Sequence, residues 1–363
     1  MGIERKKLKV LIVDDSRTFR SLLHQVISSD PWLECSGSAW NGNQALEIIR
    51  NNPPDLVTLD VEMPEKNGLE TLREIQEINS KLAEENLIGV IMVSSMTQHG
   101  AQITLQALEL GAFDFVPKPE NLTLEENLES LKLELLEKIS GYASKRPWSR
   151  KTSSFVLPKP YRTGSPAPEK KKNYKAILIG ASTGGPKALL TLIPILTENV
   201  VLPILVANHM PPFFTSSLAE SLDKKCRYSV IECKGDERLA SKQVYIAPGG
   251  KHLLMRRMGE KDVVTVLTAQ PSEDGCCPSV NKLFRSGASV FGGEVIAIVL
   301  TGMGTDGTNG LGPLKRAGAF VIAQDEKTSV VWGMPGSAVA SGFVDKISPL
   351  EKIPHFVKEQ IRE

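Results

Sequence analysis

The chain contains 363 residues, more than the roughly 100 to 200 expected of one domain, so we expect two domains, each with its own core. Lys and Arg together number 43 against 42 for Asp and Glu, a balance that excludes attraction of nucleic acid through bulk charge. The N-terminus has no apolar signal segment, and no later apolar run approaches the roughly 20 residues that span a bilayer, so we expect a cytoplasmic protein without direct membrane insertion. The five cysteines lack CxxC spacing, which fits a reducing compartment better than a disulfide or zinc framework.

Residues 1–143 alternate apolar β-branched runs with amphipathic helical patterns, which is typical of a parallel α/β sheet with right-handed crossovers. Polar residues follow the predicted strands at their carboxyl ends, where open α/β sheets place their sites. The predicted strands are Lys9–Val13, Glu34–Ala39, Leu56–Leu59, Val90–Val93 and Phe113–Val116, and the polar residues are Asp14, Asp15, Asp60, Ser94 and Lys118.

The acidic residues of this set predict a metal site. Three carboxylates in one place repel one another and raise their pKa values unless a cation joins them, and oxygen ligands suit Mg²⁺. A metal-neutralised aspartate beside a hydroxyl and a lysine can attack a phosphoryl group, because all three stabilise the phosphate oxygens, and Asp60 is the predicted nucleophile. The alternative is that Asp14, Asp15 and Ser16 only cap the following helix while the lysine lies on the surface.

Residues 1–140 resemble the response-regulator receiver family, which implies a flavodoxin-like fold. The resemblance rests on residues 13–16, 59–64, 67–68, 93–95 and 117–119. It implies that a sensor histidine kinase phosphorylates Asp60 and that Asp14 and Asp15 help to bind Mg²⁺. It also implies a switch made of Ser94, Lys118 and Phe115, where Phe stands in place of the commoner Tyr. Simple core packing is the alternative for the aromatic ring.

A linker is predicted over residues 144–173. This segment is rich in Pro, Ser and Lys and has no sustained apolar period. Residues 174–363 resume the alternation and predict a second doubly wound, mostly parallel α/β domain, with strands over Tyr174–Ile179, Leu202–Ala207, Glu294–Leu300 and Ala319–Ala323.

A glycine-rich turn follows the first of these strands. Residues 180–186 read Gly-Ala-Ser-Thr-Gly-Gly-Pro, and a helical pattern runs from Lys187 to Leu196. This matches the strand, G-x-S-x-G, helix context of a nucleophile elbow, in which glycines permit the sharp turn and the helix start favours an oxyanion. The alternative is that Ser182 or Thr183 merely caps the helix.

A serine nucleophile needs a base and a carboxylate. His209 follows the next strand, which places it at the same sheet edge as Ser182, and His252, in a glycine-rich turn, is the second choice. Asp306 lies in the loop after the strand Glu294–Leu300 and is the predicted partner of the histidine.

The same loop also contains a dinucleotide-binding pattern. Gly302, Gly304 and Gly307 follow a strand, and Asp325 stands where a ribose-binding acid is expected. Against this reading, Asp306 would place a carboxylate where the pyrophosphate must sit.

The second domain resembles the catalytic domain of the chemotaxis protein-glutamate methylesterase family, CheB. The matching residues are 179–185, 208–211, 244–249, 278–280, 300–307 and 333–335. The resemblance implies an esterase without a cofactor that removes methyl groups from glutamates, and in some members deamidates glutamine, on methyl-accepting chemotaxis receptors. Thr183 and Met303 are the predicted oxyanion residues, the latter through its backbone N–H, and ordinary packing is the alternative for Met303. Cys276 and Cys277 depart from the family's usual basic or His residue, and Asn281 from the commoner Asp. A receiver joined to a non-catalytic binding module is the remaining alternative.

Overall fold

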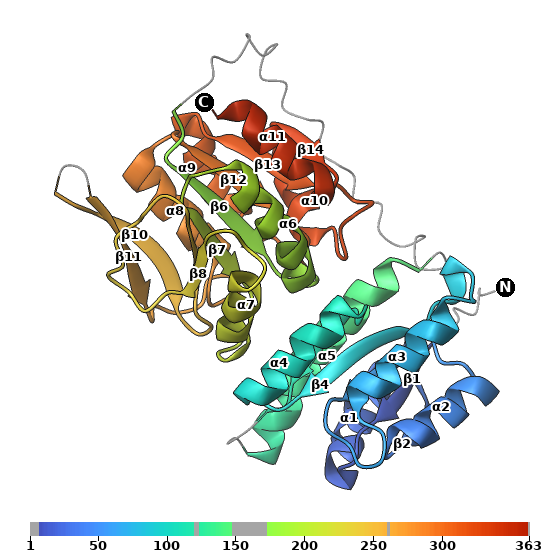
Figure 1. Cartoon of the computed structure of the whole chain (residues 1–363). Coiled ribbons are helices and arrows are strands. Elements are labelled where there is room, and N and C mark those ends of the chain that lie inside the picture. The colour runs from blue at the N-terminus through green and yellow to red at the C-terminus, as the bar shows by residue number, and fades with distance from the viewer. Residues whose placement is uncertain (1–6, 120–122, 147–172, 260–261, 362–363) are drawn as a thin grey trace. The chain divides into compact units, whose positions relative to one another are not determined.

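The computed structural model describes residues 7–119, 123–146, 173–259 and 262–361. The chain divides into two compact units, Met1–Ser153 and Ser154–Glu363, and each is described by itself (Figure 1). Of the predicted linker 144–173, only residues 144–146 and 173 fall within the described ranges. Over those ranges, no helix combines the length and the apolar character that crossing a membrane requires.

The first unit is a five-stranded sheet in the order β2-β1-β3-β4-β5, with every neighbouring pair parallel. This is the flavodoxin-like order, so the predicted fold is confirmed. Helices α1 and α5 pack together, as do α2, α3 and α4. The elements are β1 (Leu8–Val13), α1 (Arg17–Ser28), β2 (Leu33–Ala39), α2 (Gly42–Asn51), β3 (Leu56–Asp60), α3 (Gly68–Asn79), β4 (Gly89–Ser94), α4 (Gln98–Glu109), β5 (Asp114–Pro117) and α5 (Leu124–Ser144), with a 3₁₀ turn over Glu84–Asn86.

The second unit is a seven-stranded sheet in the order β14-β13-β12-β6-β7-β9-β8, again with parallel pairs throughout. A separate antiparallel hairpin, β10–β11, packs beside helix α8 (Figure 1). The strands are β6 (Ala176–Ala181), β7 (Ile204–Asn208), β8 (Ser229–Glu232), β9 (Gln243–Ile246), β10 (His252–Met258), β11 (Asp262–Thr268), β12 (Val295–Val299), β13 (Phe320–Gln324) and β14 (Lys346–Ser348). The helices are α6 (Gly185–Asn199), α7 (Phe214–Asp223), α8 (Val280–Phe291), α9 (Thr308–Ala317), α10 (Gly333–Ala340) and α11 (Ile353–Gln360), with a 3₁₀ turn over Leu350–Lys352.

Strand β6 is the centre of this sheet and positions the site. Its neighbours are β12 on one side and β7 on the other, and all residues of these three strands are buried. Such continuous apolar runs are expected of parallel strands covered on both faces. The loops that follow β6, β7 and β12 therefore meet at one edge of the sheet, which is where α/β folds bind their ligands.

Candidate functional site

An acidic cluster lies at the carboxyl edge of the receiver sheet. The Nζ atom of Lys118 is 2.8 Å from Oδ2 of Asp14 and 2.8 Å from Oδ2 of Asp60. Both aspartates are buried, whereas Asp15 is exposed, and each of the three offers an oxygen within 4.8 Å of the others. Three predicted ligands are thus brought together, with a lysine between two of them.

The electrostatics of this cluster fit a divalent cation. Burial and the charge of Asp14 raise the pKa of Asp60 to about 7, although Lys118 opposes the shift. One lysine therefore does not neutralise the two buried carboxylates. A hard cation that accepts oxygen ligands would complete the charge balance, so the donor set fits Mg²⁺.

The two other predicted switch residues lie on neighbouring strands. Ser94 ends β4 with its buried hydroxyl directed to the carbonyl of Ser95, at 3.4 Å. Phe115 lies in β5 and is 3 % exposed, with Nζ of Lys138 5.6 Å from the ring centroid. Ser16 caps helix α1, as the capping alternative predicted for this region. The acidic cluster is present as well, so capping is not the only role of these residues.

In the second unit, Ser182 stands in the tight turn between β6 and α6. Its backbone N–H donates to the carbonyl of Thr301, 3.0 Å away, and ties the turn to the loop after β12. Gly184 has φ of 73°, the left-handed conformation that begins α6. A Cβ added to Gly302 would lie 2.8 Å from Cβ of Ser182, so only glycine lets the two loops approach this closely.

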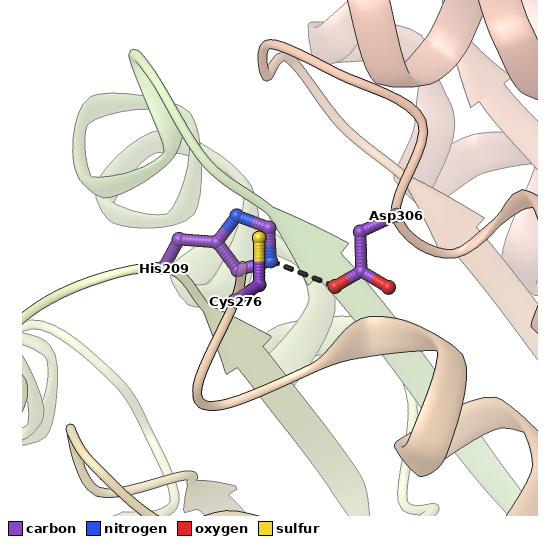
Figure 2. A group of neighbouring side chains, drawn as sticks. All are labelled: His209, Cys276 and Asp306. Atoms are coloured by element: carbon purple, nitrogen blue, oxygen red, sulfur yellow. Dashed lines mark hydrogen bonds and ion pairs between the residues drawn. The ribbon is translucent and has the colours of Figure 1, made fainter. Parts of the chain in front are cut away.

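His209 and Asp306 come from the loops on either side of that serine. Nε2 of His209 lies 2.8 Å from Oδ2 of Asp306, and the histidine side chain is 15 % exposed (Figure 2). The aspartate is 2 % exposed. It also accepts hydrogen bonds from the hydroxyl of Ser279 and from the backbone N–H groups of Val280, Asn281 and Gly307.

These bonds fix the charge of Asp306. Burial raises the pKa of its carboxyl, but the hydrogen bond and charge of His209, with the N–H groups at the start of α8, outweigh burial and lower the pKa. A carboxylate only accepts, so Nε2 of His209 carries the proton in the neutral ring and Nδ1 keeps the lone pair. That lone pair is the base available to a serine. Among the described residues, Oγ of Ser182 makes no hydrogen bond, so the pair with His209 is not closed in this structure.

The predicted oxyanion residues lie on the two loops that meet at the serine. Thr183 is buried and Met303 is partly exposed. Within the described parts of the chain, the backbone N–H of neither residue donates a hydrogen bond. Both are therefore available to an oxyanion.

The second-choice histidine has a structural place. His252 begins β10 rather than lying in a turn, and it is fully buried. Nδ1 accepts from the N–H of Ser279 at 3.1 Å, and Nε2 contacts the carbonyl of Gln270 at 3.1 Å. Because both nitrogens are used, His252 holds the start of α8 instead of serving as a base.

The structure also explains the dinucleotide pattern. Gly302 is needed for close packing against the serine turn, and Asp325 accepts hydrogen bonds from Thr328 within its own loop. The carboxylate of Asp306 occupies the helix starts where a pyrophosphate would bind. The pattern therefore has a packing role here.

Sequence reasoning missed the contributions of two residues near Asp306. Oδ1 of Asn281 accepts from the N–H groups of Gly307 and Gly310, and its Nδ2 donates to Asp274, so one buried amide joins three segments. Cys276 offers Sγ within 4.8 Å of ligand atoms of His209 and Asp306 (Figure 2). One sign of these contributions was present in the sequence, because Asn281 and Cys276 both differ from the residues that are usual at these positions in the family.

The two units define a response regulator whose second domain is an α/β hydrolytic enzyme. A family model described as CheB methylesterase matches residues 177–357, and one described as response regulator receiver domain matches residues 10–129. A protein-glutamate methylesterase/protein-glutamine glutaminase of Pyrococcus abyssi is 40% identical over 98% of this chain and 94% of that protein. One of Desulfotalea psychrophila is 38% identical over 98% of this chain and 99% of that protein.

The solved structures agree with this match. The catalytic domain of Thermotoga maritima CheB methylesterase is 39% identical, with a TM-score of 0.51, and covers 52% of this chain and 100% of that one. The chain belongs to the CheB family of protein-glutamate methylesterases/protein-glutamine glutaminases. The predicted family and fold are confirmed, and the matches support neither a non-catalytic binding module nor a dinucleotide oxidoreductase.

Proposed function

We propose that this enzyme hydrolyses glutamate γ-methyl esters on methyl-accepting chemotaxis receptors, giving glutamate and methanol, and deamidates receptor glutamine. The main support for the site assignment is the hydrogen bond between His209 and Asp306. It lies at the carboxyl edge of the sheet, where Ser182 directly follows β6. The names of the relatives supply the reaction class.

The chemistry follows from the placement of these groups. Oγ of Ser182 attacks the ester carbonyl while Nδ1 of His209 takes the serine proton, and Asp306 stabilises the imidazolium through Nε2. The N–H groups of Thr183 and Met303 bind the oxyanion. The imidazolium gives its proton to the leaving methoxide, which departs as methanol. Water, activated by the same histidine, then releases the glutamate carboxylate; for glutamine the first leaving group is ammonia.

The receiver supplies control by phosphorylation of Asp60. A sensor histidine kinase of the chemotaxis system is the donor. Asp14, Asp15 and Asp60 would hold Mg²⁺, which would supply charge neutralisation for the phosphate oxygens. Lys118 pairs with those oxygens in place of the carboxylates it contacts here. Ser94 and Phe115 form the switch that responds to the phosphoryl group. The cytoplasm is the proposed location of the enzyme.

Methanol release from methylated receptor membranes tests the esterase. Wild type, Ser182→Ala and Thr191→Ala are compared, the last as a control in which an exposed hydroxyl of α6 is lost. We expect release by wild type and the control, and at least a 10³-fold loss in Ser182→Ala. Methanol release by Ser182→Ala at the wild-type rate would contradict the assignment of Ser182 as the nucleophile.

The regulatory part has its own test. A small-molecule phosphodonor with Mg²⁺ is added to wild type and to Asp60→Asn. We expect the phosphodonor to increase release by wild type only. Activation that persists in Asp60→Asn would show that another residue accepts the phosphate.

A further inference from the structure

The loop between β11 and α8 carries a thiol to the predicted catalytic pair. Sγ of Cys276, a ring nitrogen of His209 and a carboxylate oxygen of Asp306 all lie within 4.8 Å of one another (Figure 2). The three residues come from separate loops, which is why cysteine spacing in the sequence gave no sign of a metal site. Cys276 is partly exposed, so the cluster is open on one side.

Hydrogen bonds and an ion pair hold the loop that carries Cys276 in one conformation. Glu273 and Cys276 exchange two backbone hydrogen bonds, and Arg285 pairs with the carboxylate of Glu273. Asp274 accepts from the amide of Asn281 at 3.2 Å. These bonds anchor the loop to α8, so the thiol is presented at a fixed place.

We propose that His209, Cys276 and Asp306 form a site for Zn²⁺ or a similar thiophilic divalent ion, and that the ion inhibits the esterase reversibly. Imidazole nitrogen, thiolate and carboxylate are the three ligand types that zinc prefers. Zinc bonds of about 2.0–2.3 Å place tetrahedral ligand atoms roughly 3.3–3.8 Å apart. Side-chain rotation must lengthen the 2.8 Å distance between Nε2 of His209 and Oδ2 of Asp306 and bring the other separations, which are at most 4.8 Å, into this range. Water takes the fourth position.

Coordination changes the protons of the site in a defined way. The thiol of Cys276 loses its proton to solvent, and Oδ2 of Asp306 binds the ion. Nε2 of His209 gives its lone pair to the metal, so the imidazole proton moves to Nδ1. The nitrogen that would accept the serine proton is then occupied, and inhibition follows. The inhibitory effect rests on the proposed esterase function, whereas metal binding does not.

The binding experiment uses the full chain, reduced, with Co²⁺ as a spectroscopic probe and excess Mg²⁺ to fill the receiver carboxylates. We expect thiolate-to-cobalt charge-transfer absorption with visible bands of tetrahedral intensity, both displaced by Zn²⁺. Cys276→Ser should lose the charge-transfer band. Cys277→Ser is the matched control, because it removes the adjacent thiol and should keep the band.

Esterase activity is measured in parallel, with each variant compared with its own zinc-free rate. In Cys276→Ser the zinc concentration that gives half inhibition should rise. Loss of a group that only hydrogen-bonds to a metal ligand lowers metal affinity by roughly 10- to 100-fold, so loss of a ligand itself should raise that concentration by at least as much. In Cys277→Ser it should stay unchanged, and a chelator should restore full activity.

The outcomes separate the two ideas. Absence of the band in wild type, or its persistence in Cys276→Ser, would overturn the metal site. A band without inhibition of an active enzyme would overturn the inhibitory role. A zinc-free protein that releases no methanol would refute the proposed function, while the spectroscopic result still decides the metal site.

Discussion

Asp306 and His209 are 97 residues apart in the sequence, yet Oδ2 of the first lies 2.8 Å from Nε2 of the second. The aspartate is held by N–H groups of α8 as well, so it is a fixed acceptor. Asp306→Asn keeps the shape but replaces the carboxylate that orients the protonated imidazole. We expect kcat for methanol release to fall on the order of 10³- to 10⁴-fold with little change in KM.

The control for this change is Glu326→Gln, which removes a charge from an exposed loop residue. It should retain full activity. A kcat for Asp306→Asn within threefold of wild type would show that the carboxylate does not orient the base.

Gly302→Ala should disturb the serine directly. The added Cβ would lie 2.8 Å from Cβ of Ser182 and 2.4 Å from Sδ of Met334, so one of these side chains must shift. A misplacement of about 1 Å can cost roughly 100-fold in rate. We expect a kcat loss of that order in the methanol assay.

Gly312→Ala is the matched glycine control. Gly312 lies inside α9, and its added Cβ meets side-chain atoms only at 3.4 Å or beyond. Alanine in a helix interior should stabilise by about 0.4–1 kcal/mol and leave kcat unchanged. Equal loss of activity in both variants would point to general intolerance of the domain.

Asn281→Ala should weaken the loop that bears Asp306. The variant leaves the buried N–H group of Gly310 without its acceptor, while the N–H group of Gly307 keeps its hydrogen bond to Asp306. The loss at Gly310 costs about 1–3 kcal/mol, so urea unfolding should show a fall in the free energy of unfolding of that size. The control Asn199→Ala, on an exposed helix end, should change stability by less than about 0.5 kcal/mol. Equal destabilisation by both would show that the buried amide of Asn281 does not hold the start of α9.

The stability of the receiver should depend on pH through Asp60. Its carboxyl ionises near 3.8 in the unfolded chain and near 7 in the fold, where burial and Asp14 raise the pKa. Between these values the folded state binds more protons, so the free energy of unfolding falls as pH rises and is lowest above about 7. In the absence of Mg²⁺, hydrogen exchange of the receiver amides, corrected for the pH dependence of the intrinsic exchange rates, should show this fall in the free energy of unfolding.

Two comparisons bear on that interpretation. Asp60→Asn should flatten the pH dependence, and saturating Mg²⁺ should flatten it in wild type, because the ion stabilises the ionised form. A slope that persists unchanged in Asp60→Asn would assign the proton to another group.

The two α/β folds, and the strand ends at which Asp60, Ser182 and His209 lie, could be predicted from the sequence alone. This was possible because the alternation of apolar runs and helical patterns is local, and because parallel strands always gather their carboxyl ends at one edge. The end residues of the predicted strands differ from the structure by one or two positions in most cases, since helix and strand ends depend on individual hydrogen bonds.

Which atoms meet at that edge could not be predicted from the sequence, because it depends on the tertiary fold. The hydrogen bond of Asp306 through Nε2 of His209, the use of both nitrogens of His252 within the fold, and the approach of Cys276 all depend on loops from distant segments. The order of strands brings such loops together, and no local pattern encodes their side-chain contacts, because those contacts join segments that are far apart in the chain.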